Sequence, residues 1–126
     1  MFENTEAFSG FAVKDSSQAK EFYGETLGLK VTELEPEFGL LQLELAGGRN
    51  VLVYAKEDHA PGNYTILNFQ VDNIDNAVDG LTERGVEFER YESFEQDAKG
   101  IAREQGPLIA WFKDPSGNIL SVIQDT

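Results

Sequence analysis

The chain carries an internal repeat, and this repeat limits the architectures into which it can fold. Residues 9–31 and residues 67–88 follow one plan, in which an apolar strand leads through a polar helix start into an amphipathic helix that ends at a glycine. The matched pairs, all at one offset, are Phe11 and Phe69, Val13 and Val71, Asp15 and Asn73, and Ala19 and Ala77. A repeated supersecondary unit buries its apolar face by packing against further copies. Two copies fill the chain, so we expect two half-sheets that face each other across a cleft.

Each copy is predicted to contain one strand, one helix and then three further strands. Apolar and polar residues alternate along the strands, most regularly in residues 40–45, as they do where one face of a sheet is buried. Asp15 or Ser16 is placed to cap the first helix, and Gly28 is placed to end it. The expected strands of the first copy are 8–13, 29–35, 40–45 and 51–55, and those of the second copy are 65–71, 86–91, 108–112 and 119–123.

The one break in composition along the chain is the polar segment 56–63, which contains a Pro-Gly pair. A chain of 126 residues has the size of one domain. We therefore expect a single domain over residues 1–126, with modules at about 6–55 and 64–124 joined by this linker.

The second copy also contains an insertion, residues 92–106, before its last hairpin. A loop of this length in a compact domain is usually functional or mobile. Its charged side chains, Asp97, Lys99 and Arg103, either fold over the cleft as part of a lid or are simply solvated.

The charge of the chain narrows the class of partner. Its formal net charge is −13 at pH 7, which argues against nucleic acid and against anionic membrane surfaces, because both are bound through Lys and Arg. An acidic surface is compatible with a cationic ligand, although it also serves solubility alone. The chain has no cysteine, no apolar stretch of membrane-spanning length and no N-terminal secretion signal, so we expect a cytoplasmic protein.

Several short motifs together make the chain similar to a known superfamily. The residues that carry the resemblance are Val13-Lys14-Asp15, Phe22-Tyr23, Leu27-Gly28-Leu29, Phe69-Gln70-Val71-Asp72 and the run Trp111-Phe112-Lys113-Asp114-Pro115-Ser116-Gly117-Asn118. The chain thereby resembles the vicinal oxygen chelate superfamily, which includes glyoxalase I, bleomycin-resistance proteins and extradiol dioxygenases. The resemblance covers about residues 6–124 and implies an α+β fold, in which two βαβββ modules pair around a shared cleft. It also implies a homodimer, with pairing of the two modules within one chain as the alternative.

In the metalloenzymes of this superfamily, one divalent ion is held by residues from the first and last strands of each module. The resemblance places these positions at Phe8, Leu52, Ile66 and Ser121. The first three cannot bind a metal, and a serine is a weak ligand. The only histidine, His59, lies in the linker. We therefore predict no metal and no cofactor, and whether the chain is an enzyme stays open.

Strand alternation then predicts which side chains face the cleft. Residues with the parity of the former ligand positions would line it, and the opposite, wholly apolar set would pack on the helices. Asn68 and Gln70 would orient a ligand by hydrogen bonds, unless they bond each other, the backbone or water. Tyr54 and Trp111 would grip an aromatic ligand, with core packing as the alternative for Trp111. Phe8 would either stack on a ligand or fill the vacated metal site. The candidate ligand-binding residues are Phe8, Leu52, Tyr54, Ile66, Asn68, Gln70, Trp111 and Ser121.

Three functions are consistent with the sequence. The first is a metal-independent protein that binds a small molecule, cationic or aromatic, and sequesters it as bleomycin-resistance proteins do. The second is a metal-dependent lyase, isomerase or dioxygenase with an atypical site. The third is a protein-interaction domain that kept the fold and lost the pocket.

Overall fold

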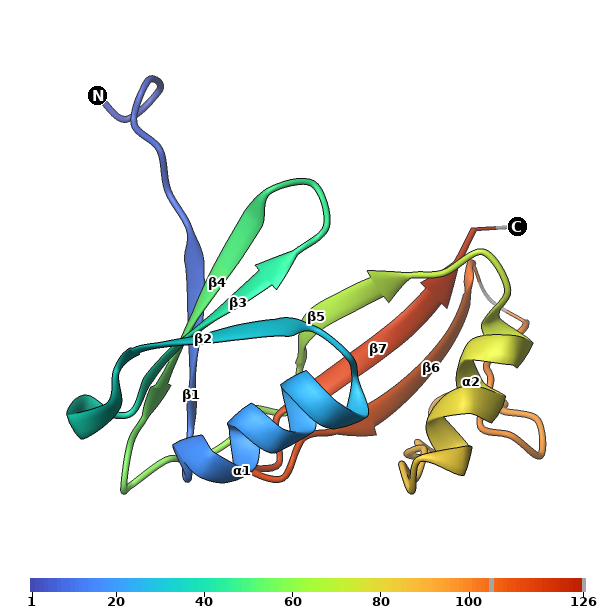
Figure 1. Cartoon of the computed structure of the whole chain (residues 1–126). Helices are drawn as coiled ribbons and strands as arrows, with labels where there is room; N and C mark the ends of the chain where they lie inside the picture. The colour runs from blue at the N-terminus through green and yellow to red at the C-terminus, as the bar shows by residue number, and fades with distance from the viewer. Residues whose placement is uncertain (105, 126) are drawn as a thin grey trace. The chain divides into compact units, whose positions relative to one another are not determined.

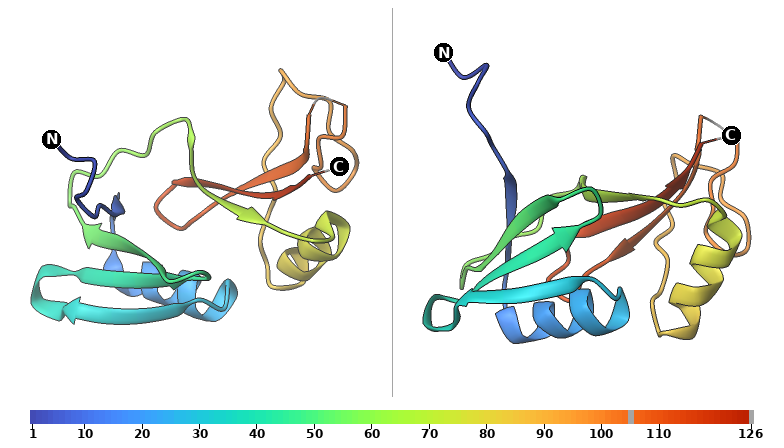
Figure 2. Two further views of the ribbon diagram at one scale, coloured as in Figure 1. Left: turned by 90° about the horizontal axis from the view of Figure 1, so that it is seen from above. Right: turned by 45° about the horizontal axis from the view of Figure 1, so that its top comes forward.

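A computed structural model of the chain describes residues 1–104 and 106–125, and these residues form two compact units (Figures 1 and 2). Unit 1 comprises Met1–His59 and unit 2 comprises Ala60–Thr126. The boundary between the units falls inside the segment 56–63 that the composition marks as a linker. In the described part of the chain, no helix is both long and apolar enough to cross a bilayer.

Unit 1 is a four-stranded sheet with a helix on one face. Its strands lie in the order β1-β4-β3-β2, with β1 parallel to β4 and the other pairs antiparallel. The helical segment packs against β3 and β4 (Figure 1). The elements are β1 (Ser9–Val13), α1 (Ser16–Glu21), the π-helical η1 (Phe22–Thr26), β2 (Lys30–Glu35), the 3-10 turn η2 (Pro36–Phe38), β3 (Leu40–Leu45) and β4 (Arg49–Ala55).

Unit 2 repeats the plan with a three-stranded sheet. Its strands lie in the order β5-β7-β6, with β5 parallel to β7 and β6 antiparallel to β7. Its helix packs on β6 and β7. The elements are β5 (Thr65–Gln70), α2 (Ile74–Glu83), β6 (Leu108–Lys113) and β7 (Ile119–Gln124).

The internal repeat is visible in the way both helices begin. The Asp15 carboxylate accepts a hydrogen bond from the backbone N–H of Gln18 at 3.1 Å, and the Asn73 side chain accepts one from the backbone N–H of Asn76 at 3.0 Å. Each bond satisfies one of the amides that a helix leaves free at its first turn. The matched pair of Asp15 and Asn73 thus performs one task in both units, which confirms the sequence prediction for Asp15.

Strand alternation correctly predicts the faces that pack on the helices. In unit 1, Val13 and Val53 are fully buried on the sheet face that meets Tyr23, which is also fully buried. In unit 2, Leu120 lies on the face covered by α2, where Ile74 is fully buried. Burial of each such side chain stabilises the fold by about 1.5–3 kcal/mol relative to leaving it exposed. Each unit therefore has its own core between one helix and one sheet face.

The strand predicted over 86–91 is wrong. This segment lies beside β6, but it pairs with it only through the bridge between Phe88 and Phe112 and a bond from the Glu89 N–H to the Trp111 carbonyl oxygen at 2.8 Å. The Gln96 side chain binds backbone groups of this segment that a further strand would otherwise pair with. The α+β fold class is confirmed, but the second module contributes one strand fewer than the first.

Gln96 binds the backbone of the 86–91 segment with its side-chain amide. Its Oε1 atom accepts from the Tyr91 N–H at 2.8 Å, and its Nε2 atom donates to the carbonyl oxygens of Glu89 at 2.8 Å and Gly100 at 2.7 Å. These are groups that a regular ladder would otherwise have to satisfy. The inserted loop therefore holds its own neighbour in place through one side chain.

Three charged residues of the 92–106 loop, Asp97, Lys99 and Arg103, bind helix α2 or one another. Arg103 donates to Asp97 at 2.9 Å and to Asp75 on α2 at 2.7 Å, while Lys99 lies 3.0 Å from Asp79 on α2. The hydrogen bond from Arg103 is the largest cause that lowers the pKa of Asp75; burial opposes it, and a hydrogen bond from Lys99 lowers the pKa further. These three loop residues are thus engaged within unit 2 rather than simply solvated.

Candidate functional site

The register of unit 2 brings three of the predicted site residues into one row across the sheet. Asn68 on β5 is paired with Ser121 on β7, and Ser121 is paired with Trp111 on β6. Directly paired residues project their side chains to the same face. Their neighbours on the helix side are the core residues of α2, so this row lies on the opposite face of the sheet.

Ser121 and Asn68 form a polar pair in the middle of this face. The Ser121 hydroxyl is fully buried and donates to the Asn68 side-chain oxygen at 2.5 Å. Asn68 itself is exposed, and its amide nitrogen meets no acceptor among residues 1–104 and 106–125. A molecule that approaches this face therefore meets an amide N–H donor already fixed in orientation by the buried hydroxyl.

Trp111 forms the centre of an aromatic cluster at the β6 end of the row. Its ring lies 5.4 Å from the Tyr91 ring in an edge-to-face arrangement and 4.8 Å from the Phe94 ring, measured between centroids. Trp111 is only 8% exposed, because Ala102 and Ile119 also pack against it. The ring therefore packs mainly against protein, and Phe94, which is 39% exposed, presents the open aromatic surface.

Tyr91 and Phe94 were absent from the residues that the sequence selects. The Tyr91 hydroxyl is buried and has no partner among the described residues. Burial raises the pKa of this phenol above its ordinary value, and the charge of Glu89 raises it further. Phe94 lies in the insertion, where no periodic pattern indicates a face, and Tyr91 lies at the end of the segment predicted as a strand, whose residues were not among those expected to line the cleft. Only the presence of aromatic residues in an otherwise polar loop could have drawn attention to them.

Gln70 borders a hollow at the end of the same sheet face. It is exposed and paired with Ile123 on β7. The hollow has a volume of about 290 Å³, and it is lined by Gln70, Val71, Asp72, Ile123, Gln124 and Asp125. Small-molecule pockets usually measure about 300–1,000 Å³. This hollow is therefore at the lower limit for holding a small ligand.

Ile66, also on β5, lies at an irregularity. The register of β5 against β7 shifts between Thr65 and Leu67, so Ile66 has no direct partner in the ladder. A bulge of this kind re-aims the side chain that it carries. Ile66 is half-buried and does not join the row of Asn68 and Ser121.

The remaining predicted residues belong to unit 1. Leu52 and Tyr54 share the sheet face opposite α1, where Leu52 is paired with Gln42 and Tyr54 is 38% exposed. Phe8 precedes β1 and is 73% exposed, so its ring fills no cavity of unit 1. That Phe8 fills a vacated metal site in a cleft shared by the two modules stays a prediction.

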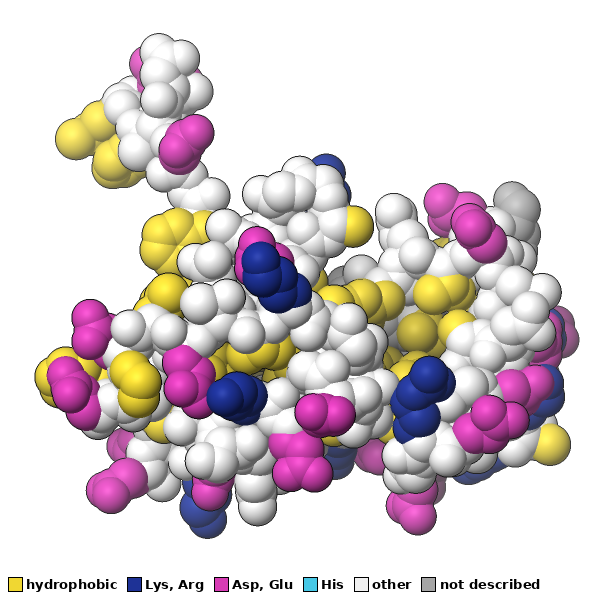
Figure 3. All heavy atoms as spheres, in the orientation of Figure 1, with side chains coloured by type: hydrophobic (Ala, Val, Ile, Leu, Met, Phe, Trp, Pro, Cys, Tyr) yellow, Lys and Arg dark blue, Asp and Glu magenta, His cyan; other side chains and the backbone are white. Residues whose placement is uncertain are grey.

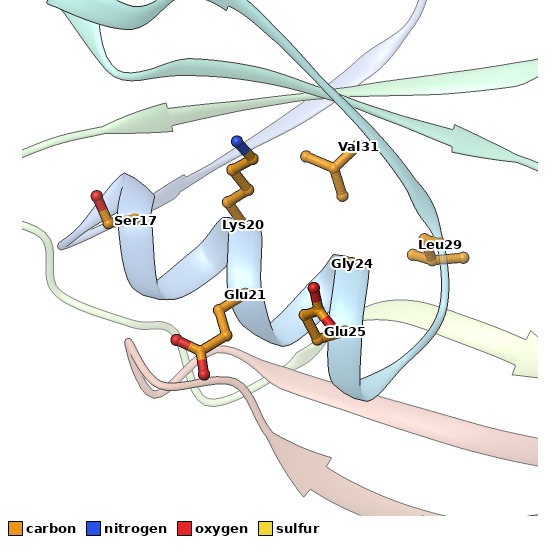
Figure 4. Close-up of a pocket in the computed structure, with 7 residues that line it drawn as sticks. All are labelled: Ser17, Lys20, Glu21, Gly24, Glu25, Leu29 and Val31. Atoms are coloured by element: carbon orange, nitrogen blue, oxygen red, sulfur yellow. The ribbon is translucent and has the colours of Figure 1, made fainter.

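Unit 1 has a separate hollow on its helix side, of about 380 Å³, between the helical segment and β2 (Figure 4). Leu29 and Val31 form an apolar wall, and Gly24 in the π-helical turn leaves the space open. The Lys20 ammonium at its rim is paired with Glu33 at 3.0 Å. No predicted site residue lines the hollow.

Comparison with known proteins places this arrangement in a family. The model of the family described as Glyoxalase/Bleomycin resistance protein/Dioxygenase superfamily matches residues 7–122. The chain belongs to this superfamily.

Proteins that are similar to this chain match it over most of its length. A protein from Bacillus subtilis (strain 168), the uncharacterized protein YraH, is 28% identical over 123 residues, which cover 87% of this chain and 90% of YraH. The crystal structure of a glyoxalase family protein from Bacillus anthracis covers all of both chains with a TM-score of 0.72 and 18% identity. TnmS3, an antibiotic binding protein from Streptomyces sp. CB03234, covers 98% of both chains with a TM-score of 0.70 and 24% identity.

The side chains at the positions that the resemblance implies for a metal do not fit a divalent ion. Phe8, Leu52 and Ile66 have no donor atom, and Ser121 offers one neutral hydroxyl, which is a weak ligand. Elsewhere in residues 1–104 and 106–125, no three His, Cys, Asp or Glu side chains lie close enough together to hold a metal ion. A divalent ion such as Zn²⁺ or Ca²⁺ needs several such ligands. We derive no metal-dependent step for this chain.

Proposed function

We propose that the chain binds a small molecule without a metal and sequesters it unaltered. The binding surface of the proposal is the face of the unit 2 sheet that exposes Asn68 and Gln70. Ser121 and Trp111 lie buried beneath this face, and Phe94, which packs on Trp111, is its exposed aromatic ring. An apolar and aromatic surface with a few fixed polar groups is the usual composition of a small-molecule site. The ligand that suits this surface has an aromatic part and a hydrogen-bond acceptor.

The state of Ser121 is the observation that carries the proposal. In the last strand of the second module, the position that serves the superfamily as a metal ligand holds a hydroxyl that is fully buried and bonded to Asn68. A hydroxyl in this state supports the orientation of a neighbouring amide. Its oxygen is fully buried and neutral, and no group of His, Cys, Asp or Glu side chains among the described residues could hold an ion together with it, which favours binding over metal-assisted chemistry.

A structural neighbour is consistent with this proposal. TnmS3 is an antibiotic binding protein that shares the fold. At 24% identity the likeness supports the scaffold only, so the ligand of this chain does not follow from it.

Isothermal titration calorimetry tests the proposal with two probe sets, metal-free bleomycin and planar aromatic compounds, each in buffer with EDTA. We expect saturable binding of at least one probe, with the probe recovered unchanged by mass spectrometry. Asn68→Leu should weaken that binding, whereas Asn63→Leu, an exposed change in the linker, should not. Absence of saturable binding across the panel contradicts the proposal. So does binding that is seen in a parallel titration without EDTA and is lost when EDTA is present.

Elemental analysis of protein purified without chelators separates this function from a metalloenzyme. About one Zn, Ni, Mn or Fe per chain would favour the metal-dependent alternative. A homodimer and a cytoplasmic location also remain proposals from the sequence, and sedimentation velocity tests the first of them.

A further inference from the structure

The inserted loop of unit 2 contains a second hollow whose chemistry is unlike that of the sheet face. Its volume is about 220 Å³, and its lining residues are Glu92, Ser93, Phe94, Glu95, Ala102 and Glu104. This volume is below the usual lower limit of about 300 Å³ for a drug-sized ligand. The hollow therefore suits one small chemical group rather than a whole molecule.

Phe94 supplies an aromatic wall that is both rigid and accessible. One part of its ring rests on Trp111 at a centroid distance of 4.8 Å, while 39% of the residue stays exposed. A backbone bond from the Phe94 N–H to the Tyr91 carbonyl oxygen, at 3.1 Å, closes the turn that presents the ring.

The charges around this wall are uncompensated. The three glutamates of the lining form no ion pair with any described residue, although the same loop contains Lys99 and Arg103. Those two cations are engaged by Asp75, Asp79 and Asp97 on the α2 side. The loop thus separates its charges, with its cations directed to α2 and carboxylates left around the aromatic wall.

We propose that this hollow binds the cationic group of an organic ligand, a quaternary or primary ammonium, against the face of Phe94. A cation is attracted by the negative face of an aromatic ring, and nearby carboxylates add a Coulombic contribution that salt weakens. Inorganic cations are excluded as the intended ligand, because they are strongly hydrated and gain nothing from the ring. The proposal deepens the function proposed above and rests on it, since it names the chemical class of the ligand.

The test uses tetramethylammonium chloride as the probe and the fluorescence of Trp111 as the reporter. Trp111 is the only tryptophan in the chain and lies in contact with Phe94. We expect a saturable change in its emission with tetramethylammonium, and none with sodium chloride at equal ionic strength or with the neutral tert-butanol. NMR shifts confined to residues 92–95 would locate the probe independently.

Matched variants separate the hollow from general surface effects. Phe94→Leu should weaken tetramethylammonium binding about two- to fivefold, the factor that corresponds to an exposed cation–π contact. Phe38→Leu removes an exposed phenylalanine of unit 1, 68% exposed, and should leave the affinity unchanged. Glu95→Gln should weaken binding at low salt only, with Glu37→Gln as its control.

Each outcome decides the proposal. A response to tert-butanol equal to that of tetramethylammonium, or an unchanged affinity in folded Phe94→Leu, overturns it, as does the absence of any saturable response. The function proposed for the sheet face is tested separately with Asn68→Leu. Loss of aromatic-probe binding in that variant, with tetramethylammonium binding retained, shows two working subsites.

Discussion

Replacement of Gln96 by alanine should destabilise unit 2 more than its modest exposure suggests. The side chain satisfies three backbone groups at once, the Tyr91 N–H at 2.8 Å and the carbonyl oxygens of Glu89 at 2.8 Å and Gly100 at 2.7 Å. A buried donor or acceptor left without a partner costs about 1–3 kcal/mol. Because these bonds are only partly buried, water can reach some of the groups, and we expect a loss of about 2–4 kcal/mol in the free energy of unfolding.

Guanidinium chloride unfolding measures this loss, with Gln18→Ala as the matched control. Gln18 lies exposed on α1 and should change stability by less than about 0.5 kcal/mol when truncated. Gln96→Glu offers a second comparison, because it keeps an acceptor for the Tyr91 N–H but turns a carboxylate toward two carbonyl oxygens. At pH 7 it should therefore be no more stable than Gln96→Ala.

Hydrogen exchange shows whether the loss has the stated cause. In Gln96→Ala the Tyr91 amide should exchange faster, because its acceptor is gone, while the Glu89 amide, bonded to the Trp111 carbonyl at 2.8 Å, should stay protected. A variant as stable as the Gln18→Ala control, with a protected Tyr91 amide, would refute the reasoning that Gln96 replaces a strand.

Three further perturbations have expected outcomes. Gly117→Ala should cost about 1–3 kcal/mol in urea unfolding, because Gly117 has φ +88° and an added Cβ would lie 2.9 Å from the Pro61 ring; Gly48→Ala, with φ +72° and open space around it, should show the backbone strain alone. Gly24→Ala should keep or slightly raise stability, because the nearest atom to its Cβ is a methyl group 3.5 Å away and alanine favours helix. Burial raises the pKa of Asp97, but hydrogen bonds from two backbone amides and one guanidinium outweigh it, so the net pKa is lowered from 3.8. Its contribution to stability is then present above pH 3.8 and lost as the pH falls through the lower folded value, so Asp97→Asn should flatten the acid limb of stability measured by urea unfolding between pH 7 and 2.5.

The sequence predicts the fold well where local rules act alone. Asp15 and Ser16 are the two predicted helix caps, because they stand just before an apolar-periodic segment, and the structure shows that Asp15 is the cap. The strand over 40–45 is predicted with its bounds intact, since strict alternation marks a half-buried strand. Alternation also separates helix-facing residues such as Val53 from their neighbours.

The prediction fails where distant groups compete. Residues 86–91 alternate as a strand should, but they pair with β6 only through the bridge between Phe88 and Phe112, and the Gln96 side chain binds the Tyr91 N–H and the Glu89 carbonyl oxygen in place of a longer ladder. The row of Asn68, Ser121 and Trp111 likewise depends on register between strands that are far apart in sequence. Alternation gives the face of each residue, but only the pairing of the strands shows which of them are neighbours.

The polar pair on the sheet face also predicts which ligands it should accept. The Asn68 side-chain oxygen is already bonded to the buried Ser121 hydroxyl at 2.5 Å, so this amide can offer a ligand only its N–H groups. The face should therefore prefer ligands with a carbonyl or aromatic nitrogen acceptor over close analogues that present only donors. Ser121→Ala would free the Asn68 oxygen and let the amide rotate. The difference in affinity between an acceptor ligand and its donor-only analogue, measured by calorimetry, should therefore become smaller. If the wild-type protein binds both analogues equally, the hydroxyl does not orient the amide, and Ser121 would then be a core residue that merely satisfies its own hydrogen bond.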